Sequence, residues 1–203
     1  MKRMSTLFAA LLLCLSAAGG GKEFLRRIHP GIEWGHTLTA ATYQHYNYLD
    51  PSIGFRINEE GWLAPPASNA YILGSISYNI SETLSFSLLS GYQGISKGRR
   101  AVPVLCRAYY YFTGMQSDGF YFTYDFGVNL LATGGHGNQL QLGTGYSMVL
   151  TPRCSVGLFA SVRAVYDQPD IWDPIEEEYI PEQNIRRNDA WYCALNIGVA
   201  LKF

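Results

Sequence analysis

The last thirteen residues of the chain alternate between apolar and small or polar side chains. From Trp191 to Phe203 the odd-numbered positions are aromatic, aliphatic or cysteine, whereas the even-numbered positions include Tyr192, Asn196 and Lys202. Successive side chains of a strand point to opposite faces, so the pattern predicts one strand with an apolar face and a small, polar face. About 9–11 tilted residues suffice for a strand to cross a bilayer.

Seven earlier segments alternate in the same way, most clearly between Phe120 and Leu130. The predicted strands therefore cover residues 31–43, 70–80, 84–93, 102–112, 120–130, 139–150, 156–165 and 191–203. Pro103 falls at the beginning of the fourth of these strands, where proline is tolerated. No long segment repeats its apolar residues at a helical spacing of about 3.6.

Two stretches without alternation, 46–69 and 167–189, are predicted as long loops. Connections one, three, five and seven are expected to be longer than connections two, four and six, an asymmetry typical of outer-membrane barrels. The fold expected from this pattern is all-β: an eight-stranded antiparallel up-and-down transmembrane β-barrel. An even number of strands brings both chain ends to the same side.

The N-terminus has the features of an export signal. Lys2 and Arg3 precede an apolar run from Leu7 to Leu15 that is too short to span a membrane, and small residues follow it. We expect a cleaved signal peptide over residues 1–18, a periplasmic leader over 19–30 and the barrel over 31–203.

Composition agrees with a lipid-facing exterior. Charged residues make up 15% of the chain, below the roughly 25% of soluble domains. The 15 Tyr, 10 Phe and 21 Gly favour strands and turns. A net charge of -1 gives no global bias toward nucleic acid, so no nucleic-acid partner is expected.

Several charged residues fall on the faces predicted to point inward. Eight strands enclose an interior only just wide enough to be filled by side chains, which disfavours a wide pore. The mixed signs of these charges predict an ion-paired polar plug, with a narrow ion path as the alternative. The plug residues are Glu33, Arg107, Asp125, Arg163 and Lys202.

Neither a cofactor nor a metal site is expected. Cys106, Cys154 and Cys193 are odd in number and far apart, so a disulfide framework is unsupported. Catalysis depends on one candidate in the first loop, where His45, Asp50 and Ser52 cluster as an acylase-like triad would.

The last predicted loop is strongly acidic. Such a run attracts divalent cations or a basic partner, or it is simply a solvated loop. Its acidic residues include Asp167, Asp170, Asp173, Glu176, Glu177 and Glu178.

The end of the chain resembles the terminal signal of bacterial outer-membrane barrels, with a polar residue, a glycine, a hydrophobic residue and a final aromatic at Asn196, Gly198, Leu201 and Phe203. Residues 91–95, 102–104 and 107–112 resemble a hairpin that recurs in small outer-membrane β-barrel proteins of Bacteroidetes. The resemblance implies location in the outer membrane among its lipid and lipopolysaccharide, and folding by the barrel-assembly machinery.

The sequence thus predicts a non-enzymatic barrel with structural, adhesion or binding roles. Loops 46–69 and 167–189 are the candidate surfaces for an extracellular partner. Two alternatives stay open: a lipid-modifying outer-membrane enzyme that transfers or removes acyl chains of lipid A, and a soluble ligand-binding barrel of lipocalin type, in which the apolar faces point inward.

Overall fold

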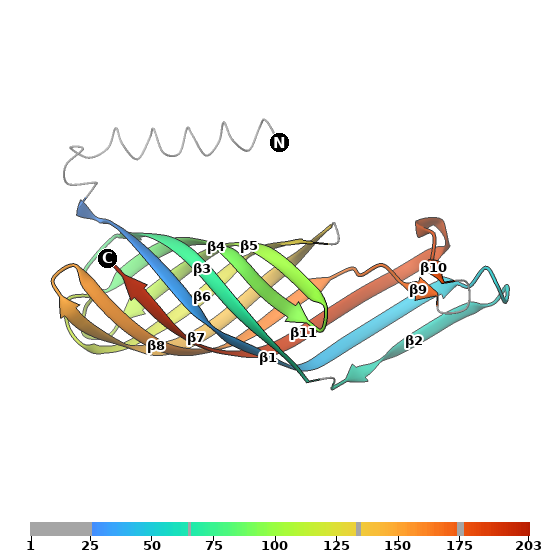
Figure 1. Cartoon of the computed structure of the whole chain (residues 1–203), viewed down its shortest axis with the longest axis horizontal. Helices are drawn as coiled ribbons and strands as arrows, with labels where there is room; N and C mark the ends of the chain where they lie inside the picture. The colour runs from blue at the N-terminus through green and yellow to red at the C-terminus, as the bar shows by residue number, and fades with distance from the viewer. Residues whose placement is uncertain (1–25, 65, 133–134, 174–176) are drawn as a thin grey trace, which may run out of the picture.

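Eight long strands close into an antiparallel barrel in the computed structural model, which describes residues 26–64, 66–132, 135–173 and 177–203. The strands pair in the order β11-β8-β7-β6-β5-β4-β3-β1, and β1 pairs with β11 to close the sheet (Figure 1). The predicted fold is confirmed. The barrel strands are β1 (Ile28–Leu49), β3 (Ala67–Asn79), β4 (Leu84–Ser96), β5 (Arg99–Tyr111), β6 (Gly119–Leu131), β7 (His136–Thr151), β8 (Cys154–Asp167) and β11 (Ile185–Lys202).

Both described ends of the chain lie at one end of the barrel, which we call the terminal end; the opposite end is the loop end (Figure 1). β1 begins at Ile28, a few residues before the predicted start of the barrel at Gly31. The predicted signal peptide, residues 1–18, lies outside the described residues. Among the described residues there is no helix long and apolar enough to span a membrane.

The two faces of the wall divide as the alternation predicts. Trp34 and Ile197 are 41% and 69% exposed on the outside, whereas Glu33 and Asn196 are each 3% exposed on the inside. The outer surface is therefore apolar and the inner surface largely polar, the opposite of what a lipocalin-type barrel requires.

One inward position that strict alternation predicts in β1 is wrong, because the strand contains a β-bulge. The register of β1 against β11 shifts between Thr39 and Ala41. An inserted residue reverses the alternation beyond it, so Thr42, at 2% exposed, faces the interior instead of Ala41.

The predicted loop 46–69 is wrong in its first part. β1 continues to Leu49 and turns back as β2 (Arg56–Leu63), which pairs with β1 from Thr42↔Leu63 to Leu49↔Arg56. β11 accompanies β1 over the same length, so β2, β1 and β11 form an extension that projects beyond the barrel (Figure 1). The strands of the extension do not alternate between apolar and polar side chains, because neither face of this sheet belongs to the apolar belt. The backbone pairing between the strands nevertheless continues.

The predicted loop 167–189 also contains regular structure. A small hairpin of β9 (Trp172–Asp173) and β10 (Glu178–Tyr179) is followed by the 3-10 turn η1 (Glu182–Asn184), and β11 already begins at Ile185. The chain therefore returns to the sheet six residues earlier than the predicted strand at Trp191.

The predicted pattern of loop lengths holds at the first and seventh connections but is wrong in the middle of the chain. Between β4 and β5 only Lys97 and Gly98 remain, whereas the connection from Phe112 to Asp118 at the terminal end is longer. Strands β4 and β5 extend through polar residues to the loop end, because backbone pairing needs no apolar side chains there.

Pro103 lies in the interior of β5, not at its beginning. The register of β4 against β5 passes from Ser90↔Val104 to Gln93↔Ala101 at this point. A proline lacks the N–H that the ladder needs, and the interrupted pairing accommodates it.

Candidate functional site

Arg107 joins two carboxylates inside the barrel, and we call Glu33, Arg107 and Asp125 the ion cluster. Arg107 Nε and Nη2 donate to Asp125 Oδ1 and Oδ2, both at 2.7 Å. Nη2 also donates to Glu33 Oε1 at 3.2 Å, and Nη1 donates to Glu33 Oε2. All three side chains are at most 3% exposed, so a guanidinium from β5 binds β1 and β6 through paired contacts.

Lys202 is the charged residue nearest the terminal end of the barrel interior. Its Nζ donates to Tyr111 Oη at 2.5 Å and lies 3.2 Å from the ring centroid of Tyr109. Tyr111 belongs to β5, four strands from β11 around a wall of eight, so the contact crosses the full width of the barrel. Lys202 is held by aromatic rings, and within the described part of the chain it lacks the direct ion pair expected for the plug.

A network of amides fills the interior nearer the loop end; we call Gln93, Asn129, Gln139, Gln141 and Asn196 the amide network. Gln93 Nε2 donates to Asn129 Oδ1 at 2.5 Å and to Gln139 Oε1 at 2.6 Å. Asn196 Nδ2 donates to Gln141 Oε1 at 3.1 Å, and Asn196 Oδ1 accepts from Thr37 at 2.7 Å.

Arg163 spans the interior from β8 to β4, strands on opposite sides of the wall. Its Nη1 donates to Gln93 Oε1 at 3.0 Å and its Nη2 to the carbonyl oxygen of Gly94 at 2.9 Å. The sequence placed Arg163 in one plug with Glu33 and Asp125. The structure places it in the amide network, without an ion pair among the described residues.

Apolar side chains share the interior with these polar groups. Leu89 and Leu105 are at most 1% exposed and pack in one cluster with Tyr71, Tyr109 and other rings. Toward the loop end a second cluster is built from Ile95, Ala101, Val165, Ala190 and Tyr192. Gln93 and Leu89 both fall on inward positions of β4, so the alternation along this strand was the feature of the sequence that could have predicted their place in the interior.

Arg99 and Asp167 pair at the loop end of the interior. Asp167 is 1% exposed, and Tyr46 and Tyr192 lie within electrostatic range of the pair. Burial raises the pKa of Tyr46 to about 12, so this phenol is neutral near pH 7.

One face of the extension carries a polar cluster. His45 lies opposite Glu60 on β2 and Asp189 on β11, in neighbouring pairs of the same sheet. Tyr43 donates to Glu60, and His45 contacts Asn58 Oδ1 at 3.2 Å. For Asp189, burial favours the neutral acid, but hydrogen bonds from Tyr166 and Arg187 outweigh it and lower the pKa. Side-chain bonding of this kind holds an exposed sheet in a defined shape.

Aromatic side chains accompany this cluster. Tyr43 packs on Trp62 with ring centroids 5.3 Å apart, and Tyr166 packs on Trp191 at 5.0 Å. Trp191 is 45% exposed on the outer face, where the strands leave the apolar belt. Aromatic rings at that level are typical of barrel girdles.

The acylase-like triad is not assembled. Asp50 Oδ1 accepts from Ser52 Oγ at 2.6 Å and from the backbone N–H of Ser52 at 2.9 Å, a local turn at the tip of the hairpin. His45 lies back along β1 and contacts β2 instead. The residues are near in sequence, but an extended strand separates His45 from the turn, which is why sequence proximity was misleading.

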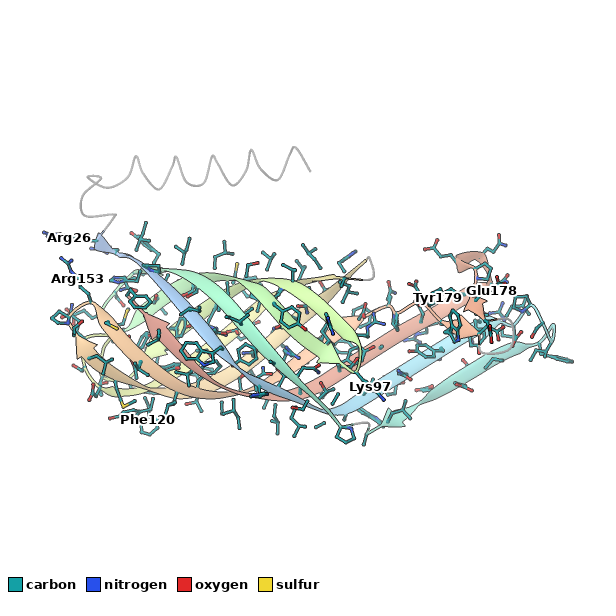
Figure 2. All side chains as sticks on the ribbon, viewed as in Figure 1. Arg26, Lys97, Phe120, Arg153, Glu178 and Tyr179 are labelled. Atoms are coloured by element: carbon teal, nitrogen blue, oxygen red, sulfur yellow. The ribbon has the colours of Figure 1, made fainter. Side chains whose placement is uncertain are left out.

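The described residues of the acidic stretch do not form a single exposed cluster. Asp167 is bound to Arg99, Asp173 is 4% exposed, and Asp170 and Glu178 face solvent. Figure 2 shows Glu178 and Tyr179 beside the extension, well beyond Lys97 at the loop end of the shorter strands. Glu177 is exposed, and Glu176 lies outside the described residues.

The four residues of the terminal pattern have different surroundings. Asn196 belongs to the amide network, and Gly198 faces inward against the hydroxyl of Tyr71. Leu201 is half-buried, and Phe203 is 50% exposed at the rim, where its N–H donates to the carbonyl oxygen of Pro30 at 2.9 Å.

A cavity of about 1030 Å³ opens at the terminal end. It is bordered by Arg26, Arg27 and Arg153 together with Glu82 and Phe203. Figure 2 shows Arg26 and Arg153 at this end of the barrel and Phe120 on its outer surface. A smaller cavity of about 390 Å³ lies beside it and reaches Lys202 and Tyr111.

The described residues contain no group of three or more His, Cys, Asp or Glu side chains able to hold a metal ion. Cys106, Cys154 and Cys193 are free thiols. Cys106 is exposed on the apolar outer face, as its parity predicts.

No family model matches the sequence, and no curated protein matches it significantly. Among solved structures, the outer membrane protein OprG from Pseudomonas aeruginosa is 13% identical, with 86% of this chain and 95% of that chain covered and a TM-score of 0.51. Neisserial surface protein A is 14% identical, with 87% and 97% covered and a TM-score of 0.46. AlkL, solved by solid-state NMR in lipid bilayers, is 11% identical, with 85% and 90% covered and a TM-score of 0.40. The likeness to OprG shows a shared barrel fold, and low identity limits it to the fold.

Proposed function

We propose that this protein is a non-enzymatic outer-membrane barrel that displays the extension and residues 168–184 at the cell surface for binding or adhesion. The observation that carries the proposal is the contrast between the two parts of the molecule. The barrel interior is filled by contacts that cross it, such as Lys202 to Tyr111 and Arg163 to Gln93. The extension, in contrast, presents side chains to solvent.

The apolar belt supports placement in a membrane, and the likeness to OprG supports the outer membrane of a Gram-negative cell. The termini then lie in the periplasm and the extension outside the cell, among lipopolysaccharide. The terminal pattern Asn196, Gly198, Leu201, Phe203 is proposed to be read by the barrel-assembly machinery, and membership of the Bacteroidetes-type family is part of the same proposal.

The surface offered to a partner is aromatic as well as polar. Phe55 and Trp62 are 74% and 66% exposed, and the rings of Trp172 and Tyr179 pack edge to face 5.1 Å apart on the neighbouring hairpin. Exposed rings held by a bonded sheet suit a protein or carbohydrate surface, because little conformational freedom is lost on binding.

Surface display is tested by inserting one epitope tag at either of two glycine turns. Gly54 at the tip of the hairpin and Gly114 at the terminal end both have positive φ, and a side chain at Gly54 would meet nothing within 4 Å. We expect antibody to label intact cells that carry the tag at Gly54. The tag at Gly114 should react only after permeabilisation. The reverse labelling would overturn the orientation, and release of the protein from membranes by a high-salt wash would overturn the location.

The enzymatic alternative is decided by mass spectrometry of lipid A and phospholipids with and without the gene. We expect no difference in acyl chains. An acyl change that His45→Ala abolishes would contradict the non-enzymatic proposal.

A further inference from the structure

Arg163 carries a positive charge inside the barrel and has no counter-charge among the described residues. Its side chain is 2% exposed. Among the described residues, ion pairs in the interior join Arg107 to Glu33 and Asp125, and Arg99 to Asp167. Lys202 lies within electrostatic range of Arg107 and of Glu33, the second carboxylate of the ion cluster. Arg163 is left over, and an uncompensated buried charge is strongly unfavourable.

The hydrogen bonds of Arg163 are also incomplete. A guanidinium has five N–H donors, and those of Arg163 meet two neutral acceptors, Gln93 Oε1 and the carbonyl oxygen of Gly94. Its Nε is buried and has no hydrogen-bond partner within the described part of the chain. The hydroxyl of Tyr71 is also buried without a hydrogen-bond partner among the described residues. It lies within electrostatic range of Arg163, and of the Glu33, Arg107 and Asp125 charges of the ion cluster.

The neighbouring side chains do not supply the missing acceptor. Ala194 lies opposite Arg163 on β11 and contributes only a methyl group. Gln141 lies opposite it on β7, and its Oε1 already accepts from Asn196 Nδ2. A water molecule would satisfy the N–H but would bring no negative charge.

We propose that the barrel interior binds a small monovalent anion of the size of chloride, held by Arg163 Nε with the Tyr71 hydroxyl as a second donor. The anion completes both unpartnered donors and neutralises the guanidinium. This site is separate from the display function of the extension, so either can fail without the other.

Crystals of the refolded mature protein grown in sodium bromide test the site directly. We expect an anomalous bromide peak in hydrogen-bonding contact with Arg163 Nε and Tyr71 Oη. A density at Nε that is only water, or bromide found solely on exposed arginines, would overturn the proposal.

Thermal unfolding in detergent gives an independent readout. At constant ionic strength, the unfolding midpoint should rise with chloride in place of gluconate and saturate, because chloride binds the folded state. Arg163→Met should lose this dependence, and the exposed Arg187→Met serves as the matched control that keeps it. An Arg163→Met protein that folds and retains the chloride effect would contradict the assignment.

Tyr71→Phe keeps the test decisive where Arg163→Met does not fold. Loss of one hydroxyl donor should raise the chloride concentration for half-maximal stabilisation by about fivefold, since a hydrogen bond is worth roughly 1 kcal/mol. An unchanged half-maximal concentration would remove Tyr71 from the site, and the absence of any chloride effect in the unmodified protein would remove the site itself.

Discussion

Gly35 on β1 and Gly198 on β11 lie directly opposite each other at the seam that closes the barrel, and the hydroxyl of Tyr71 lies against both. A Cβ at position 198 would stand 2.1 Å from Tyr71 Oη and 2.7 Å from the carbonyl oxygen of Trp34. The paired glycines make room for a tyrosine from β3 at the point where the first and last strands meet.

Gly198→Ala should therefore destabilise the barrel by about 1–3 kcal/mol, because the added methyl displaces Tyr71 or the β1 backbone. Urea unfolding in lipid vesicles measures the change. Gly74→Ala is the matched control, since its Cβ would meet only the carbonyl oxygen of Ser90 at 3.9 Å. Tyr71→Phe should recover part of the loss in the Gly198→Ala background. Equal stabilities of the two alanine variants would contradict the seam argument.

Arg107→Met should cost about 3–5 kcal/mol of stability, since it leaves the carboxylates of Glu33 and Asp125 buried without a partner. The same unfolding assay applies, with the exposed Arg153→Met as control. Combining Arg107→Met with Glu33→Gln and Asp125→Asn should restore much of the stability, because no buried charge remains. A triple variant as unstable as the single one would show that the ion cluster acts through shape and not through charge.

Removing the hairpin should leave the barrel intact. The variant replaces residues 44–61 by Asn-Gly, which joins Tyr43 directly to Trp62. Tyr43 and Trp62 are a cross-strand pair, and Asn-Gly supplies a two-residue turn suited to a hairpin. The deleted residues contribute nothing to the ion cluster or the amide network. We expect the folded form to keep its heat-dependent shift on gels while binding at the cell surface is lost. Failure of the shortened chain to fold would assign the extension a structural role.

Asp50 should make the tip of the hairpin sensitive to acid. The hydrogen bond from the Ser52 side chain, with backbone N–H groups of Ser52 and Ile53, lowers the pKa of Asp50 below its usual 3.8. Because the pKa of Asp50 is lower in the folded protein than in the unfolded chain, Asp50 stabilises the turn fully above pH 3.8. This stabilisation is lost as the pH falls through the folded-state pKa of Asp50. Hydrogen exchange of residues 50–55 should accelerate in that range, and Asp50→Asn should remove the pH dependence. An identical pH profile in the variant would exclude Asp50 as the cause.

The filled interior predicts little or no conductance across a planar bilayer. Side chains from opposite strands meet in the middle, as Lys202 and Tyr111 do. Single-channel recording provides the measurement, and a stable channel of large conductance would show that the plug residues move aside.

The inward positions of the charged residues followed from parity alone, but their partners did not. Glu33, Arg107 and Asp125 come from three strands, and their contact depends on how far the strands tilt and stagger around the wall. Arg163 has the same parity as Arg107, yet it meets amides and a carbonyl oxygen instead of carboxylates. The sequence did not predict the extension because strands beyond the apolar belt have no apolar face to mark them.

By itself, the sequence determined the number of barrel strands, which face of each points inward apart from the part of β1 beyond its bulge, and the closing role of the last strand. Those properties depend on side-chain alternation, which is local and has a period of two. Only the tertiary structure decided which residues meet across the interior, that Arg163 has no counter-charge among the described residues, and that residues 42–63 fold back as a hairpin. Contacts across a closed barrel depend on the register of all eight strands together, and no local pattern records it.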